Sequence, residues 1–103
     1  MLYTKPIYMG TFRAMYAGDV EDRYLDIAGD LATGETISSV TISVADADGV
    51  AVAGCISNET LSDTQVDFRL TAPSEVGTYS LEAVFVISDG QSITRYALFR
   101  VYE

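Results

Sequence analysis

The stretch "VGTYSLEAVFVISDGQSITRYALFRV", residues 76–101, decides the fold of this chain. Apolar residues recur at every second position on both sides of Asp89-Gly90, the pattern of two strands joined by a tight turn. The two core-facing sets are expected to be Tyr79, Leu81, Ala83, Phe85 and Ile87 on the first strand, with Ile93, Ala97, Phe99 and Val101 on the second. The stretch therefore predicts a long antiparallel hairpin.

The loop length of this hairpin follows from the requirement that both sets share one face. A three-residue loop, Ser88–Gly90, places Phe85 opposite Ile93 and needs Gly90 in the left-handed region as part of a bulge. A two-residue turn would instead place Phe85 opposite Thr94 and separate the two sets. The three-residue loop is therefore predicted. The same reasoning predicts the loop 47–49, with Val44 opposite Val52.

This register leaves four apolar side chains on the opposite face of the hairpin, namely Val84, Val86, Tyr96 and Leu98. Single exposed apolar residues are ordinary on a protein surface, but four on neighbouring strands form a patch. We expect a covering arm or a partner subunit to remove them from water, and they are candidate interface residues.

The rest of the chain also reads as short strands separated by turns. Strands are predicted near 23–28, 37–45, 50–57, 65–71, 78–88 and 91–102, and no segment shows a sustained helical stripe. The expected fold is all-β, an antiparallel β-sandwich. Gly77-x-Tyr79 resembles the tyrosine corner of immunoglobulin-like sandwiches, so the Tyr79 hydroxyl is expected to bond the backbone within residues 73–76.

Charge and composition narrow the function classes. The 103 residues carry a net charge of −9, which argues against binding to nucleic acid or to anionic lipid. No apolar run resembles a membrane span or the core of a signal peptide. The hydrophobic content of 49% is high for a small acidic domain and indicates surface buried in an assembly.

Residues able to support catalysis or metal binding are scarce. The sequence has no histidine and a single cysteine, Cys55, which is expected to be a small half-buried residue and not a reactive thiol. "DADG" at Asp46–Gly49 lacks the later oxygen ligands of a calcium loop and is read as a hairpin turn. We expect no enzyme, no catalytic residue, no metal and no cofactor.

The first residues differ from the rest in charge and pattern. Residues 1–18 hold two cations and no acid, and their apolar residues keep no period for long. We expect residues 1–20 to form an N-terminal arm that docks on a neighbour, and residues 21–103 to form the sandwich. A first strand folded onto the domain is the alternative. The candidate arm anchors and contacts are Tyr3, Tyr8, Phe12, Met15 and Tyr16.

The order of segments across residues 24–101 is similar to that of the phage fibre–tail adaptors, a family of small bacteriophage virion proteins. Leu25-Asp26-Ile27 resembles the family's acidic "LDY" opening, and residues 34–39 resemble its "GDTI-x-S" turn. The segments 40–44, 66–70, 77–81 and 95–101 resemble its strands. The family's opening tryptophan is missing here, and the N-terminal segment lies outside the resemblance.

The resemblance implies a non-enzymatic virion protein with an immunoglobulin-like fold, present in many copies. Its expected partners are other virion proteins, whether tail, fibre, portal-proximal or capsid subunits, with no nucleic acid and no membrane. It is expected in the virion after synthesis in the host bacterial cytoplasm. The leading interpretation is a tail or fibre adaptor. A capsid decoration (cement) protein and an immunoglobulin-like ligand-binding module are the alternatives.

Overall fold

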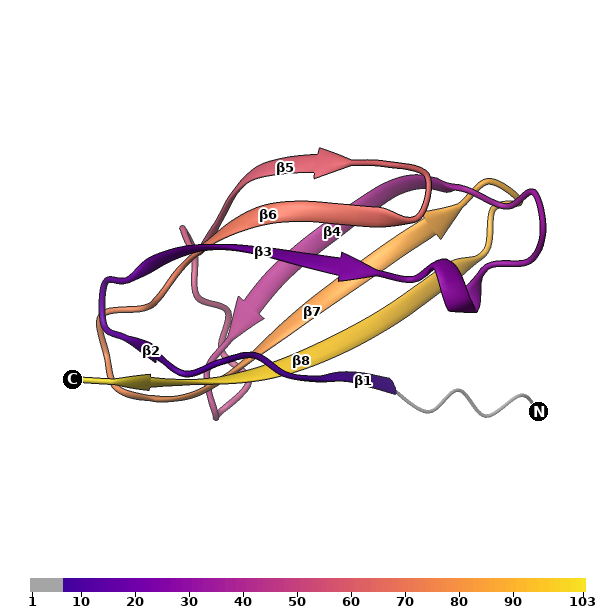
Figure 1. The fold of residues 1–103 in the computed structure, drawn as a ribbon. Helices are drawn as coiled ribbons and strands as arrows, with labels where there is room; N and C mark the ends of the chain where they lie inside the picture. The colour runs from indigo at the N-terminus through magenta and orange to yellow at the C-terminus, as the bar shows by residue number, and fades with distance from the viewer. Residues whose placement is uncertain (1–6) are drawn as a thin grey trace.

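The computed structural model describes residues 7–103, which form two β-sheets packed face to face (Figure 1). The larger sheet contains β1 (Ile7–Thr11), β2 (Met15–Tyr16), β4 (Ile37–Ala45), β7 (Gly77–Ile87) and β8 (Ser92–Tyr102). The smaller sheet contains β3 (Val20–Asp26), β5 (Ile56–Leu61) and β6 (Gln65–Thr71). The only helical element among these residues is the 3₁₀ turn η1 (Ala28–Asp30). The predicted all-β sandwich is confirmed.

The strand order is β1-β8-β7-β4 in the larger sheet, with β2 also on β8, and β3-β6-β5 in the smaller sheet. β1 and β2 run parallel to β8, whereas the other pairs are antiparallel. The chain changes sheet after β2, β3, β4 and β6, so neither sheet is built from one continuous stretch of sequence. Both sheets turn one apolar face inward.

The β7–β8 hairpin has the predicted register. Phe85 lies opposite Ile93, and the Ile87 amide donates to the Gln91 carbonyl at 2.8 Å across the loop 88–90. Gly90 has a φ of 92°, in the left-handed region that a residue with a Cβ adopts at a cost. Core pairing therefore selected the longer loop, as expected.

The turn after β4 is also as predicted. The Val52 amide donates to the Val44 carbonyl at 2.8 Å, and Gly49 has a φ of 82°. One carboxylate oxygen of Asp46 accepts hydrogen bonds from the amides of Asp48 and Val50, both at 2.9 Å. "DADG" is thus a hairpin turn whose first aspartate stabilises the loop.

The prediction of a strand at 50–57 is wrong over most of that range. Ala51 makes only an isolated bridge to Ala45, and β5 begins at Ile56. Between them the chain leaves the larger sheet for the smaller one, turning at Gly54 with a φ of 81°. The apolar residues of this connection mimic a strand because Val52 and Cys55 both face the interior.

The core lies between the sheets and is built around Phe85 and Phe99, both almost fully buried. Tyr79 stacks on Phe99 with ring centroids 5.6 Å apart. Arg95 shares the inward face of β8, where its guanidinium pairs with the Asp30 carboxylate at 3.1 Å. The loop that carries η1 is thereby fastened to the end of the sandwich, since a buried cation requires a partner.

The N-terminal segment corrects the predicted arm. Ile7–Thr11 and Met15–Tyr16 pair with β8, the Phe12 amide donates to the Leu98 carbonyl at 2.8 Å, and Met15 is 1% exposed. Residues 7–16 therefore form two strands on the edge of β8, interrupted at residues 12–14, and not a separate arm. Tyr3 lies outside the described residues, and only the backbone of Tyr8 is described.

Candidate interaction surface

The outer face of the larger sheet carries the four predicted side chains. Val84 and Val86 on β7, with Tyr96 and Leu98 on β8, all lie on the face opposite the core. Val84, Val86 and Tyr96 are half-buried by their neighbours in the sheet, and Leu98 is 37% exposed. The direction of these side chains was predicted correctly. Their role as an interface stays a prediction.

Two exposed tyrosines extend this surface along β8. Tyr16 lies opposite Tyr102 in the parallel pairing of β2 with β8, and their exposures are 64% and 48%. Tyr102 shares the face of Tyr96 and Leu98 because side chains alternate along a strand. We call this side of the larger sheet the outer face; its apolar and aromatic side chains are Tyr16, Val84, Val86, Tyr96, Leu98 and Tyr102.

Sequence reasoning placed Tyr16 among the arm residues and overlooked Tyr102. The period of two along residues 92–102 was the signal that could have found Tyr102. Two further arm candidates, Met15 and Phe12, are not free anchors, because Met15 is buried and Phe12 packs against the core beside Phe68, 6.4 Å away between ring centroids. They contribute to the interior of this domain rather than to a partner.

The outer face carries few charges for so acidic a chain. Among the side chains described on β7 and β8, only Glu82 and Arg100 are charged on this side. Arg100 lies over the Tyr102 ring at 5.7 Å, a cation–π contact. A surface rich in tyrosine and aliphatic groups, with one cation and one anion, is suited to a protein partner.

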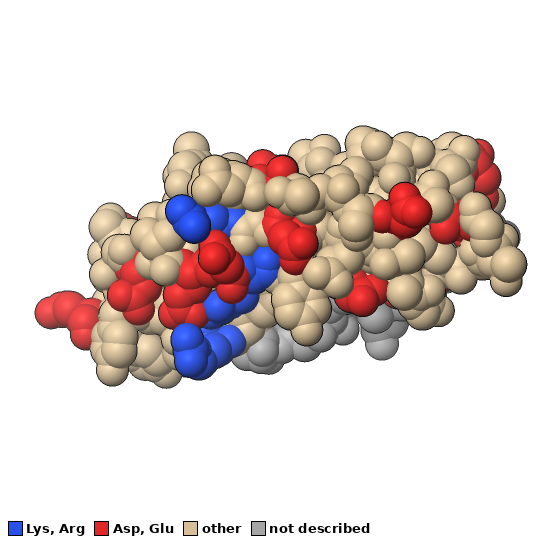
Figure 2. All heavy atoms as spheres, turned by 45° about the horizontal axis from the view of Figure 1, so that its top comes forward, with Lys and Arg blue, Asp and Glu red and all other residues tan. Residues whose placement is uncertain are grey.

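Three arginines, Arg13, Arg23 and Arg69, gather instead beside the smaller sheet. In Figure 2 the arginines lie together with acidic residues around them. Arg13 and Arg23 both pair with Glu21, and Arg69 pairs with Asp22 at 3.1 Å. The Arg23 side chain, and then that of Arg13, lowers the pKa of the Glu21 carboxyl below its ordinary value of 4.5. Each of these arginines is thus paired with a carboxylate of the same domain.

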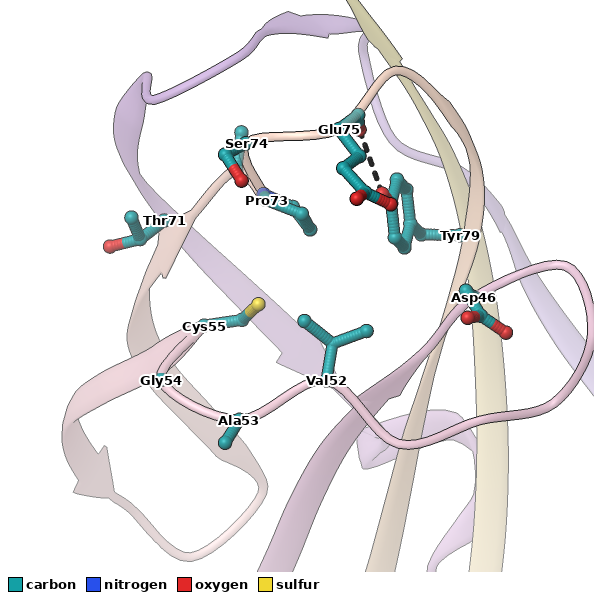
Figure 3. A pocket seen from close by; sticks show the side chains of 11 residues that line it. Asp46, Val52, Ala53, Gly54, Cys55, Thr71, Pro73, Ser74, Glu75 and Tyr79 are labelled. Carbon is teal, nitrogen blue, oxygen red and sulfur yellow. Dashed lines mark hydrogen bonds between the residues drawn. The ribbon is translucent and has the colours of Figure 1, made fainter.

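A hollow of about 340 Å³ opens at one end of the sandwich (Figure 3). Its wall includes the tyrosine corner, in which the Tyr79 hydroxyl donates to the Glu75 carbonyl at 2.7 Å. This bond confirms the expectation for residues 73–76. Burial raises the pKa of the Tyr79 phenol, so the hydroxyl keeps its proton and remains a donor.

Cys55 turns its sulfur into the same hollow, facing Pro73 (Figure 3). The thiol is buried, and burial raises its pKa above the ordinary value of 9.0. A nucleophilic cysteine needs the opposite shift. Within residues 7–103 no group of three histidine, cysteine or carboxylate side chains is placed to hold a metal ion. No helix in this part of the chain is long and apolar enough to cross a membrane.

Comparison with solved structures identifies the fold class. CopC from Methylosinus trichosporium OB3b is similar with a TM-score of 0.55 and 21% identity, over 87% of this chain and 83% of that one. Titin M4 is similar with a TM-score of 0.50 and 17% identity, over 92% and 90% of the two chains. No protein-family model and no curated protein matches the sequence.

The chain is thus an immunoglobulin-like β-sandwich, as the tyrosine corner indicated. At these identities the likeness concerns the fold alone. The fold is shared by proteins of unrelated function, so function must be argued from the surfaces of this chain.

Proposed function

We propose that this protein is a non-enzymatic structural component of a bacteriophage virion, a tail or fibre adaptor that joins other virion proteins through its outer face. The observation that carries the proposal is that face itself, with its aromatic and aliphatic side chains and its two charges. The resemblance of residues 24–101 to the phage fibre–tail adaptors supplies the virion context.

Burying the outer face against a partner supplies enough free energy to support a contact. Removing about 300 Å² of apolar surface from water stabilises a contact by roughly 7 kcal/mol, before the costs of association are subtracted. Tyrosine side chains suit this role because they bury much area with few rotatable bonds. The acids elsewhere on the chain would discourage unspecific contacts through other faces.

A capsid decoration protein is the alternative within the same class. Both candidates need a protein-binding face and no catalytic residues, so the outer face does not separate them. Copy number does, because an adaptor matches the rotational symmetry of a tail, whereas a decoration protein covers the shell in hundreds of copies. An immunoglobulin-like ligand-binding module is the further alternative, and it would use loops rather than a sheet face.

The experiment has two parts. Quantitative mass spectrometry and cryo-electron microscopy of purified particles should find the protein at the tail, in a copy number set by tail symmetry. Particles that lack the protein would refute the virion assignment. Hundreds of copies on the shell would select the decoration protein instead.

The second part tests the face. Leu98→Asp should lower incorporation into particles at least tenfold while the domain stays folded. Tyr24→Asp is the matched control, because Tyr24 is an exposed aromatic residue on the smaller sheet. Equal incorporation of the two variants would show that the outer face is not the contact.

A further inference from the structure

Within residues 7–103 the outer edge of β4 pairs with no other strand over residues 39–43, and this free edge differs from the other strand edges of the sandwich. β3 carries four charged residues in seven, β5 is broken by Asn58 with a φ of 54°, and β1 shifts register before Gly10. Charges and irregularities of this kind keep an edge from pairing with other chains. β4 has neither charge nor proline in its nine residues, ISSVTISVA, and its pairing with β7 is regular from Ser39 to Ala45.

The backbone groups at this edge can be assigned from the hairpin. Because the Ile87 amide donates to Gln91, odd-numbered residues of β7 bond to β8 and even-numbered ones bond to β4. Thr41 lies opposite Val84, so the odd-numbered residues of β4 bond to β7. The N–H and C=O groups of Val40 and Ile42 therefore point toward the free edge. The Val44 carbonyl points the same way and is taken by the Val52 amide.

We propose that β4 pairs with β4 of a second copy of this chain, antiparallel, about a two-fold axis at Thr41. In this register Val40 lies opposite Ile42 of the second copy, and Ile42 lies opposite its Val40. Each pair exchanges two hydrogen bonds, so all four edge groups on each chain are satisfied. The two larger sheets then join into one continuous sheet across the axis.

The side chains favour a second copy as the occupant. Val40 and Ile42 are half-buried on the core side, and pairing across the axis covers both in both chains. Thr41 meets Thr41 on the outer side, where hydroxyl and methyl groups pair well across strands. Two copies of a chain with a net charge of −9 repel over most faces. Along Ser39–Ser43 no like charges meet, so this register avoids that repulsion.

The length of the pairing is set by the hairpin that follows β4. The bridge between Ala45 and Ala51 occupies the edge beyond Val44, and the pairing with β7 shifts at Ser38. The shared strand is thus confined to residues 39–43 of each chain. Its centre at Thr41 follows from these two limits as well as from the hydrogen-bonding pattern.

Sedimentation velocity of the purified chain over a range of concentrations tests the dimer. Thr41→Lys places two ammonium groups at the axis and should weaken dimerisation at least tenfold. Thr94→Lys is the matched control, since Thr94 flanks the same Val84 from β8. A chain that stays monomeric to millimolar concentration, or a dimer equally sensitive to both variants, overturns the proposal.

Cysteine cross-linking tests the register. Directly opposed residues of a non-hydrogen-bonded pair have Cα atoms about 4.5 Å apart, within disulfide range. Thr41→Cys should therefore give a covalent dimer under mild oxidation. Ser39→Cys alone should not, but it should link to Ser43→Cys when the two variants are mixed. The wild-type chain is the control for the buried Cys55. Absence of the Thr41 cross-link, or a dimer held by another face, would refute the β4 pairing.

Discussion

Met15 lies opposite Val101 in the parallel pairing of β2 with β8, and its side chain is 1% exposed. We predict that Met15→Ala lowers the free energy of unfolding by about 2–5 kcal/mol, because truncating a buried methionine leaves a cavity. Urea denaturation measures the loss. Tyr16→Ala is the control, since the neighbouring exposed side chain should change stability by less than about 1 kcal/mol.

The pairing of Met15 with Val101 also predicts what happens when the N-terminal strands are removed. Removing residues 2–16 takes away β1 and β2, exposes the edge of β8 and uncovers Val101. We expect the truncated chain to lose its cooperative unfolding transition in circular dichroism. A truncated protein that stays folded with unchanged stability would show that the N-terminal strands are dispensable additions to the sandwich.

We predict that replacing Gly90 lowers the stability of the domain because of its backbone conformation alone, and not because of a steric clash. A Cβ at this position meets no atom within 4 Å, but its φ of 92° is unfavourable for an L-residue. Gly90→Ala should therefore cost about 1–2 kcal/mol of stability. Gly29→Ala is the control, because Gly29 also has open space around it and no positive φ. Equal effects of the two substitutions on thermal unfolding would contradict this account.

Tyr79→Phe removes the hydroxyl from the tyrosine corner and leaves the Glu75 carbonyl without this donor. The expected loss is about 0.5–1.5 kcal/mol, the usual contribution of one hydrogen bond. Tyr24→Phe, at an exposed position on β3, should be close to neutral. Denaturation of both variants provides the measurement, and an unchanged Tyr79→Phe variant would show that the bond adds nothing to stability.

Acidification should weaken the charge cluster around Glu21. The pKa of Glu21 is lower in the folded chain than its ordinary value of 4.5, because Arg23 and Arg13 stabilise the carboxylate. Its contribution to stability is therefore fully present above pH 4.5 and is lost as the pH falls through the lower folded pKa. The stability difference between wild type and Glu21→Gln should shrink over that range.

The matched control for this titration is Glu59→Gln, an exposed glutamate on β5. This substitution removes a carboxylate without touching the ion pairs of Glu21 with Arg13 and Arg23. If the Glu21→Gln difference stays constant down to pH 2, the ion pairs contribute nothing that depends on the charge of Glu21.

The hairpin and the outer face could be predicted because strand periodicity and turn chemistry act locally. The requirement that Phe85 and Ile93 lie opposite each other on the core face determined the length of the loop. The loop length then determined which side chains of the hairpin face outward. Arg95 lies on the same inward face of β8 as Ala97 and Phe99, but it was not recognised as buried. Its partner Asp30 comes from η1, far away in the sequence.

The N-terminal segment was assigned wrongly because its strands are short and interrupted. β2 has two residues, and β1 shifts register before Gly10, so neither strand presents enough alternation to be detected. Their position depends on the edge of β8, which is supplied from the other end of the sequence. The candidate contact surface changed accordingly, losing Phe12 and Met15 to the interior and gaining Tyr102.

The parallel course of β1 and β8 also affects how the domain responds to mechanical load. β1 begins at Ile7, which lies opposite Arg95, and β8 ends at Tyr102, so these two residues lie toward opposite ends of the edge that β1, β2 and β8 form (Figure 1). Tension applied between these two residues pulls the strands along their common axis, so the bonds joining them are loaded in shear and must break together. An antiparallel pair pulled from one end would open bond by bond at a lower force.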